Sequence, residues 1–393
     1  MAELADAPDL GSGGRPWGFE SLHPHHGDGK RRLFRFICQE FNNHTGLYVS
    51  DLDRVMIVSQ LLREVVGLTV TIYDVAREAK VSMATVSRVL NGTAVVKDET
   101  KRRVLDAIDR LGYRPNAVAR GLASKKTRTI GVIVPDVSAA FVAEVVRGIE
   151  DIAAMYEYHI ILTNSDGQLS REVDLVGTMW EKQVDGIIYM THKVQKEHVD
   201  AFEQAQIPVV LCATEDPERR IPSVNIDNVR AGRDAGQYLL QKGCRHVVFV
   251  TTDEGYSVLA DRRGAGLANC REFESFVRLE IGDGRYEKAL PRLSEHLRSH
   301  AVDGIVAASD ELGLASIHAA QDAGMNVPKD IKVIAFDNTR LATMVRPEMT
   351  VIAQPMYDFG AVSMRLLTKL LHDEPVDSYS VILLHNIVER QST

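Results

Sequence analysis

The sequence of 393 residues has only four cysteines and no long hydrophobic run. Cys38, Cys212, Cys244 and Cys270 lie far apart, without Cys-x-x-Cys spacing or flanking histidine pairs, which argues against a zinc site and against a disulfide framework. No window of about 18 apolar residues could span a bilayer, and the first residues lack the basic start and apolar run of a secretory signal. We therefore expect a cytoplasmic protein without a metal ion or cofactor.

The sequence context of a catalytic nucleophile is also missing. No serine or cysteine lies in a Ser-His-Asp or Cys-His arrangement with supporting motifs, so we do not expect an enzyme. The composition, with 45% apolar and 25% charged residues, is that of a globular protein large enough for two or three domains.

The net charge of -8 is distributed unevenly along the chain. Between Thr71 and Ile130 there are 13 Lys or Arg and 6 Asp or Glu, a local charge of +7 that leaves -15 for the rest. A basic module attached to an acidic body is typical of a protein whose module binds a polyanion.

Residues 1–67 differ in composition from everything that follows. The segments "GSGGRPWG" and "HPHHGDGKRR" are rich in Gly, Pro, His and charge, so we expect disorder up to about Lys30. The opening also resembles the conceptual translation of a transfer-RNA gene. We interpret residues 1–67 as a disordered or artefactual extension and place the natural start near Leu68.

Three short helices are predicted between Thr71 and Tyr113, because apolar residues recur there at helical spacing. Thr71 and Ser82 are candidate N-caps, and Gly92 and Gly112 are candidate terminators. Three helices in about 43 residues make a minimal bundle.

The second of these helices has a distinctive exposed side. Val86, Val89 and Leu90 form its apolar face. Left near or on the exposed side are Met83, Ala84, Thr85, Ser87 and Arg88. Short side chains let a helix approach base pairs closely, and an arginine can bond guanine in the major groove. The pattern favours the recognition helix of a helix-turn-helix, although a helical hairpin with an ordinary polar face has the same periodicity.

The segment "RPNAVARGLASKKT" at 114–127 has helix formers and a basic end but no wide apolar face. It is either a flexible linker or a hinge helix that folds only against DNA. In the second case Leu122 would insert into the minor groove, with Lys125 and Lys126 near phosphates.

Apolar runs and helix-length polar segments alternate after residue 127. The runs are "TIGVIVPD", "YHIILTNSD", "VDGIIYM", "IPVVLCA", "RHVVFVTT", "FVRLEIG", "VDGIVAAS" and "IKVIAFD". Continuous apolar runs of this length are typical of buried parallel strands in βαβ units. Because "VDGII" at 184–188 recurs as "VDGIV" at 302–306, we expect an α/β fold with two similar lobes. A ligand cleft would lie between them at the carboxyl ends of the strands.

These motifs together resemble the lactose-repressor (LacI/GalR) family of transcription regulators over residues 70–393. The resemblance is strongest in "TIYDVAREAKVSMATVSRVLNG", "RLGYRPNAVARGLASKKT" and "IGVIVPD". Within the family, "AAQDAGMNVPKDIKVIAFDNTRLATMVRPEMT" and "QPMYDFGAVSMRLLTKLL" are similar to the catabolite regulators of Gram-positive bacteria. The resemblance implies a helix-turn-helix headpiece at 70–115, a hinge helix at 116–127 and a two-lobed periplasmic-binding-protein-like core of parallel sheets at 128–393.

The resemblance also implies which residues contact DNA. They are Tyr73, Ser82, Met83, Ala84, Thr85, Arg88, Asn91, Asn116, Ala119, Leu122 and Ala123. Leu122 would act at the centre of a pseudo-palindromic operator, where two hinge helices meet, so the DNA-binding form would be a homodimer.

The catabolite regulators use serine-phosphorylated phosphocarrier protein HPr as co-repressor. The matching residues here are Tyr357, Asp358, Val362 and Arg365, with Arg365 as the partner of the phosphoserine. Without the resemblance, the same segment reads as an amphipathic helix with Arg365 on its solvated face.

The resemblance further places Arg263, Asp310 and Asp337 in an effector pocket. Asp310 could instead serve only as the N-cap of the helix that follows it. Between Thr251 and Tyr286 the chain is shorter than the family pattern, and this stretch would form part of the cleft wall. Whether phosphorylated sugars bind as additional effectors stays open.

We therefore expect a homodimeric regulator of carbon catabolite repression and activation. A near alternative is a local sugar-operon repressor that a small sugar releases from DNA. A sugar-binding protein or α/β enzyme without a DNA role is the alternative from another class, and the basic headpiece argues against it.

Overall fold

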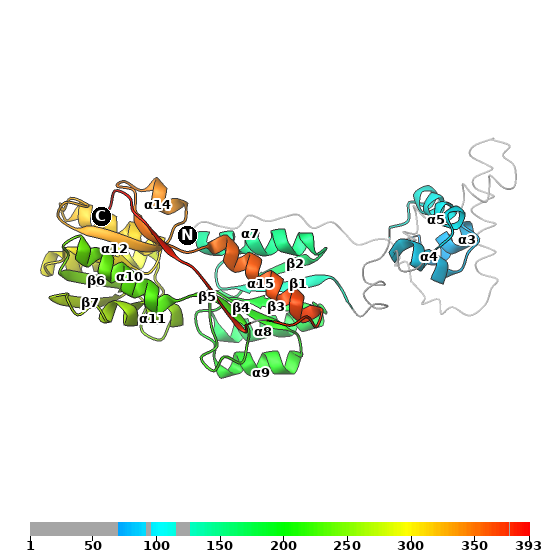
Figure 1. Ribbon diagram of the computed structural model, residues 1–393, viewed down its shortest axis with the longest axis horizontal. Coiled ribbons are helices and arrows are strands. Elements are labelled where there is room, and N and C mark those ends of the chain that lie inside the picture. Colours follow the sequence, from blue (N-terminus) through cyan, green and yellow to red (C-terminus); the bar gives the residue numbers. More distant parts are fainter. Residues whose placement is uncertain (1–69, 92–95, 115–125, 377) are drawn as a thin grey trace, which may run out of the picture. The chain divides into compact units, whose positions relative to one another are not determined.

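The computed structural model describes residues 70–91, 96–114, 126–376 and 378–393 (Figure 1). The chain divides into two compact units, residues 1–115 and 116–393. Among the described residues, no helix is long and apolar enough to cross a membrane.

The first unit contains three helices: α3 (Ile72–Glu78), α4 (Met83–Asn91) and α5 (Asp98–Leu111). Their small core is built around Val75, Val86 and Val104, which are fully buried. The predicted three-helix bundle is confirmed. So are the caps at Thr71, which precedes α3, and at Gly112, which ends α5 in the left-handed conformation with φ 60°.

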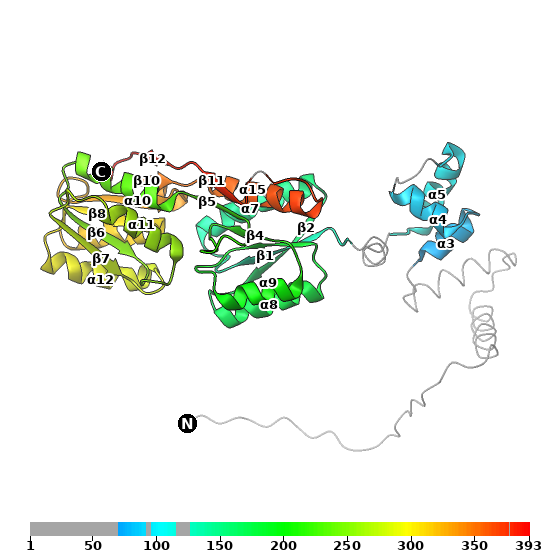
Figure 2. The ribbon, with the colours of Figure 1, turned by 60° about the horizontal axis from the view of Figure 1, so that its bottom comes forward.

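The second unit has two lobes, each built on a six-stranded sheet (Figure 2). The sheet of the amino-terminal lobe has the strand order β11-β5-β4-β3-β1-β2, and every neighbouring pair is parallel. Its strands are β1 (Thr129–Val134), β2 (His159–Asn164), β3 (Gly186–Tyr189), β4 (Val209–Cys212), β5 (Ser223–Ile226) and β11 (Ser380–Leu383). Helices α7 (Ala140–Met155) and α15 (Met356–Leu371) cover one face, and α8 (Leu169–Glu181) and α9 (Lys196–Ala205) cover the other (Figure 2).

The sheet of the carboxy-terminal lobe has the order β12-β10-β9-β8-β6-β7, with β12 antiparallel to β10. Its strands are β6 (His246–Thr251), β7 (Ser275–Glu280), β8 (Gly304–Ala307), β9 (Lys332–Asp337), β10 (Thr350–Ala353) and β12 (Asn386–Val388). Around it lie α10 (Asn228–Gln241), α11 (Val258–Ala268), α12 (Tyr286–Ser299), α13 (Asp310–Asp322) and α14 (Arg340–Met344). The α/β fold with parallel sheets is therefore confirmed.

The chain passes between the lobes more than once. After β10 in the carboxy-terminal lobe, α15 and β11 belong to the amino-terminal lobe, and β12 then returns to the carboxy-terminal sheet. All eight predicted strands are present. The sequence did not reveal β5, β10, β11 and β12, which are only three or four residues long, two of them with an asparagine within them.

Candidate DNA interface, helix surface and interlobe pocket

Helix α4 buries one side and exposes the side that the sequence assigns to DNA. Val86 is fully buried, Val89 and Leu90 are partly buried, and Met83 is 41% exposed. Ala84 and Arg88 are exposed as well, and no ion pair holds Arg88 within the described part of the chain. The arginine is therefore available for an external acceptor.

The turn before α4 is stabilised by its own side chains. The Ser82 hydroxyl accepts a hydrogen bond from the Thr85 N–H at 3.2 Å and lies 2.9 Å from the Thr85 hydroxyl. Ser82 thus caps the helix as predicted. Tyr73 on α3 is 66% exposed. The other predicted DNA contacts, namely the Asn91 side chain, Asn116, Ala119, Leu122 and Ala123, lie outside the described residues, as does Gly92.

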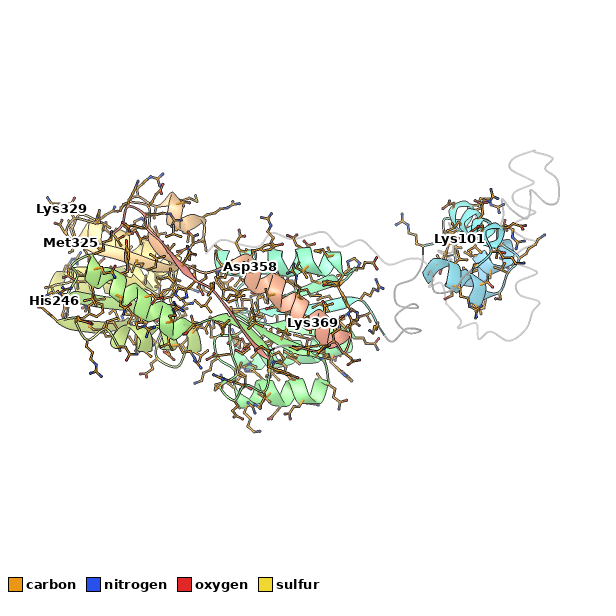
Figure 3. The ribbon with its side chains drawn as sticks, in the orientation of Figure 1. Lys101, His246, Met325, Lys329, Asp358 and Lys369 are labelled. Atoms are coloured by element: carbon orange, nitrogen blue, oxygen red, sulfur yellow. The ribbon has the colours of Figure 1, made fainter. Side chains whose placement is uncertain are left out.

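Helix α15 presents the residues that the sequence assigns to a co-repressor. Tyr357, Asp358 and Arg365 are exposed and Val362 is half-buried, all within an arc of roughly 140° on the helix. Figure 3 shows Asp358 and Lys369 along the outer side of this helix. Arg365 forms no ion pair with any described residue.

The sequence did not predict that Asp151 on α7 contacts this surface. The Tyr357 hydroxyl donates a hydrogen bond to the Asp151 carboxylate at 3.1 Å, and this bond raises the pKa of Tyr357. Asp151 and Tyr357 are 206 positions apart, so no sequence spacing could have joined them. The contact fixes the first turn of α15 against α7.

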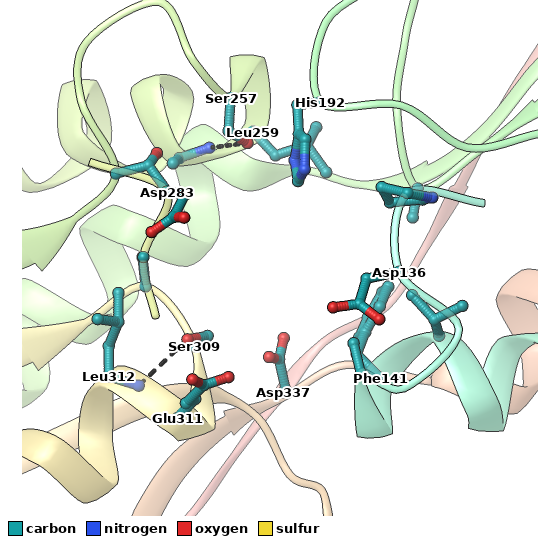
Figure 4. A pocket seen from close by; sticks show the side chains of 18 of the residues that line it. Asp136, Phe141, His192, Ser257, Leu259, Asp283, Ser309, Glu311, Leu312 and Asp337 are labelled. Carbon is teal, nitrogen blue, oxygen red and sulfur yellow. Dashed lines mark hydrogen bonds between the residues drawn. The ribbon is translucent and has the colours of Figure 1, made fainter. Parts of the chain in front are cut away.

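A pocket of about 360 Å³ lies between the two lobes of the second unit (Figure 4). Residues at the carboxyl ends of parallel strands line it, among them Asp136 after β1, His192 after β3 and Asp337 at the end of β9. This is the position predicted for a ligand cleft in such folds. Arg263, Asp310 and Asp337, which the resemblance assigned to an effector pocket, all line it.

Arg263 is 6% exposed and its guanidinium makes hydrogen bonds to three neutral groups. They are the Asn228 side chain at 2.9 Å, the Ala308 carbonyl at 2.8 Å and the Gln354 side chain at 3.1 Å. The guanidinium also lies 4.2 Å from the centre of the Phe336 ring. Burial lowers the pKa of Arg263 to about 10, and the nearby Asp337 opposes that shift.

Asp310 does not cap α13, which corrects one interpretation of the sequence. Ser309 is the N-cap, because its hydroxyl accepts the Leu312 N–H at 3.3 Å, and Asp310 is the first helical residue. One Asp310 carboxylate oxygen accepts the Thr339 N–H instead. Burial, and then the charge of Asp337, raise the pKa of Asp310 to about 7.

This raised pKa predicts how stability depends on pH. The folded state binds the Asp310 proton more tightly than the unfolded state, whose pKa is near 3.8, so stability falls as pH rises from about 4 to 7. We expect the decrease in the free energy of unfolding over this pH range to be smaller in Asp310→Asn than in the wild type, by on the order of 3 kcal/mol. Chemical denaturation between pH 5 and 8 measures the slope of the free energy of unfolding against pH. Asp322→Asn at the exposed end of α13 should keep the wild-type slope, and an unchanged slope in Asp310→Asn would contradict the assignment.

Contacts across the pocket mouth join the lobes, and the sequence did not predict them. The rings of His192 and Tyr256 lie 4.6 Å apart, and the Val258 N–H donates to the His192 carbonyl at 3.0 Å. Arg262 on α11 forms an ion pair with Glu215 in the loop after β4. Burial lowers the pKa of His192, and the charge of Glu172 opposes that shift.

Comparison with known proteins identifies two domains. Residues 71–116 match the bacterial regulatory proteins of the lacI family, and residues 237–393 match a periplasmic binding protein-like domain. Catabolite control protein A of Priestia megaterium is 50% identical over 333 residues, which are 83% of this chain and 100% of that protein.

Solved structures of transcription regulators are also similar to this chain. The crystal structure of the transcription regulator CcpA of Lactococcus lactis is 33% identical, with a TM-score of 0.63 over 67% of this chain and 98% of that chain. The lac repressor dimer bound to operator and an anti-inducer has a TM-score of 0.76 over 83% of this chain and 99% of that chain. At 22% identity, the second likeness supports the fold alone.

Proposed function

Because the chain belongs to the lacI family of bacterial regulatory proteins and is closely related to catabolite control protein A, we propose that this transcription regulator serves carbon catabolite repression and activation. It acts in the cytoplasm, as a homodimer on pseudo-palindromic operators. Serine-phosphorylated HPr is its co-repressor and docks on α15.

The observation that supports DNA recognition is the exposed side of α4. Small residues and Arg88, which has no ion-pair partner among the described residues, face outwards there, while the apolar side packs on α3 and α5. In this proposal Arg88 reads a base edge in the major groove, and Tyr73, Met83, Ala84 and Thr85 contact bases or backbone. The residues of 116–127 would form the hinge helix, with Leu122 in the minor groove.

The exposed surface of α15 supports the co-repressor proposal. A guanidinium that has no carboxylate partner among the described residues matches a phosphoserine dianion. Tyr357 and Asp358 on the same side supply an aromatic contact and a hydrogen-bond acceptor. Docking would favour the arrangement of the core in which two hinge helices meet, a shift between two populated states.

Fluorescence anisotropy of a labelled catabolite-type operator tests this proposal. Serine-phosphorylated HPr is expected to tighten binding by about 5- to 150-fold, the usual range of allosteric coupling. Arg365→Ala should abolish that gain and leave binding of the bare regulator unchanged. Lys369→Ala, one turn further along α15, is the matched control. A gain that survives in Arg365→Ala, or no gain in the wild type, would overturn the co-repressor proposal.

The same assay separates the proposal from the local sugar-operon repressor. The interlobe pocket favours that second candidate, because a small ligand could act there without any HPr. In that case HPr would have no effect and a sugar would weaken operator binding. If Arg88→Ala binds the operator as tightly as the wild type, the recognition-helix assignment itself is wrong, since one such contact contributes about 1–3 kcal/mol.

A further inference from the structure

A single carboxylate holds the backbone where the chain enters the amino-terminal lobe, just before β1. The Thr127 N–H donates a hydrogen bond to Asp185 Oδ1 at 2.7 Å, and the Arg128 N–H donates one to Asp185 Oδ2 at 2.9 Å. The Thr127 hydroxyl lies 2.9 Å from Asp185 Oδ1 and 2.8 Å from the Gln183 carbonyl oxygen, and it donates to one of them. Both oxygens of Asp185 are therefore bound to successive N–H groups, and bonds to a carboxylate are stronger than those between neutral groups.

Two further segments of the same lobe contact residues 126–128. Lys126 Nζ donates to the carbonyl oxygen of Leu371, the last residue of α15, at 3.4 Å, and a cation at this end of a helix is stabilising. Arg128 forms an ion pair with Glu157, and its carbonyl oxygen accepts the His159 N–H at 2.9 Å. Figures 1 and 2 show the start of β1 and the end of α15 at the same end of the lobe.

The backbone at Arg128 has the left-handed conformation, with φ 53°. A residue with a Cβ adopts this conformation at a cost, so its surroundings must hold it there. Asp185 does so, because the N–H groups of Thr127 and Arg128 converge on its carboxylate as successive N–H groups do around a bound anion. The direction of the chain before β1 thus depends on a side chain 57 positions from Arg128.

The carboxy-terminal lobe has the same arrangement at the second copy of the repeated sequence. Asp185 belongs to "VDGII" and Asp303 to "VDGIV". The Asp303 carboxylate accepts the Arg245 N–H at 2.8 Å and the His246 N–H at 2.9 Å, where β6 begins. Arg245 follows α10, so Asp303 joins two parts of one lobe. The chain before Lys126 leads instead to the three-helix unit, so Asp185 holds the end of a connection between two units.

We propose that Asp185 is a positioning residue for DNA binding, which fixes the backbone of Thr127 and Arg128 from which the chain continues to the three-helix unit. The carboxylate contacts no DNA and acts only through this backbone. When its bonds are lost, the connecting segment gains conformational freedom that operator binding must remove again. The inference rests on the proposed recognition of an operator and is independent of HPr.

Fluorescence anisotropy of a labelled operator, with the full chain and without HPr, tests this role. Asp185→Asn keeps the shape of the side chain but leaves only one acceptor oxygen for the two N–H groups. We expect the operator affinity to fall about five- to thirtyfold, which corresponds to re-ordering about one backbone residue on binding. The affinity for DNA of unrelated sequence should change by less than about twofold, because the basic residues of the headpiece are unchanged.

Asp303→Asn is the matched control, because it removes the same kind of carboxylate from the other lobe. Both variants should lower the thermal unfolding temperature of the protein by similar amounts. Only Asp185→Asn should weaken operator binding, whereas Asp303→Asn should bind the operator within about twofold of the wild type, since no connection to the headpiece begins at Arg245.

The Thr127 hydroxyl provides a second, milder variant. Thr127→Val removes the hydroxyl and keeps the N–H, so it should weaken operator binding less than Asp185→Asn does, and Thr127→Ser should restore the wild-type affinity. The inference is overturned if Asp185→Asn binds the operator as tightly as the wild type, or if Asp303→Asn weakens operator binding equally. A wild type that binds the operator no better than unrelated DNA would overturn the proposed DNA recognition itself, and this inference with it.

Discussion

Gly360→Ala is expected to destabilise the amino-terminal lobe by about 3 kcal/mol or more, because α15 and α7 touch through their backbones. A Cβ at position 360 would lie 1.9 Å from the Val145 carbonyl oxygen, and one at Gly148 would lie 2.1 Å from the Tyr357 carbonyl oxygen. Because neither glycine has a side chain, the backbones of α7 and α15 can lie in contact at these two positions. Neither obstacle is the end of a flexible side chain, so the helices themselves would have to move apart.

Urea denaturation followed by circular dichroism measures this loss. The matched control is Gly177→Ala in α8, where a Cβ would meet nothing within 4 Å. That change should be neutral or stabilise by about 0.5–1 kcal/mol, since alanine is the better helix former. Equal stability of the two variants would show that α7 and α15 can separate without cost.

Arg263→Met is expected to cost about 3–5 kcal/mol, the usual penalty for leaving buried charge without its partner. Asp337 would then lose the nearby guanidinium charge, and the Asn228 and Gln354 side chains would lose the hydrogen bonds that Arg263 donates to them. Since a carboxyl can escape this penalty by taking up a proton, the loss should be larger at pH 8 than at pH 6.

The neighbouring arginine provides the comparison. Arg262 pairs with Glu215 and its side chain is 43% exposed, so Arg262→Met should cost about 1 kcal/mol or less. Adding Asp337→Asn to Arg263→Met should recover part of the stability, because it removes the carboxylate that Arg263 would otherwise stabilise. A loss in Arg263→Met that is the same at both pH values, with no recovery in the double variant, would contradict the electrostatic account.

Strands that are buried in the sheets and caps that are formed by nearby residues could be predicted from the sequence. The strands β1, β3, β4, β6, β8 and β9 are buried in parallel sheets, so nearly every residue in them is apolar and each could be read from the sequence. The same holds for α4, whose period of apolar residues showed which side would be exposed. Caps at Ser82 and Gly112 were predicted because they depend on residues within a few positions of each other.

The sequence by itself therefore determined the class of fold, the three-helix headpiece and the side of α4 that faces outwards, because periodicity and capping act over a few residues. Only the tertiary structure decided that α15 packs on α7 in the first lobe, and that one Asp310 oxygen has no donor among the described residues. Backbone approach and the electrostatics of burial depend on segments far apart in the chain, and no local pattern encodes them.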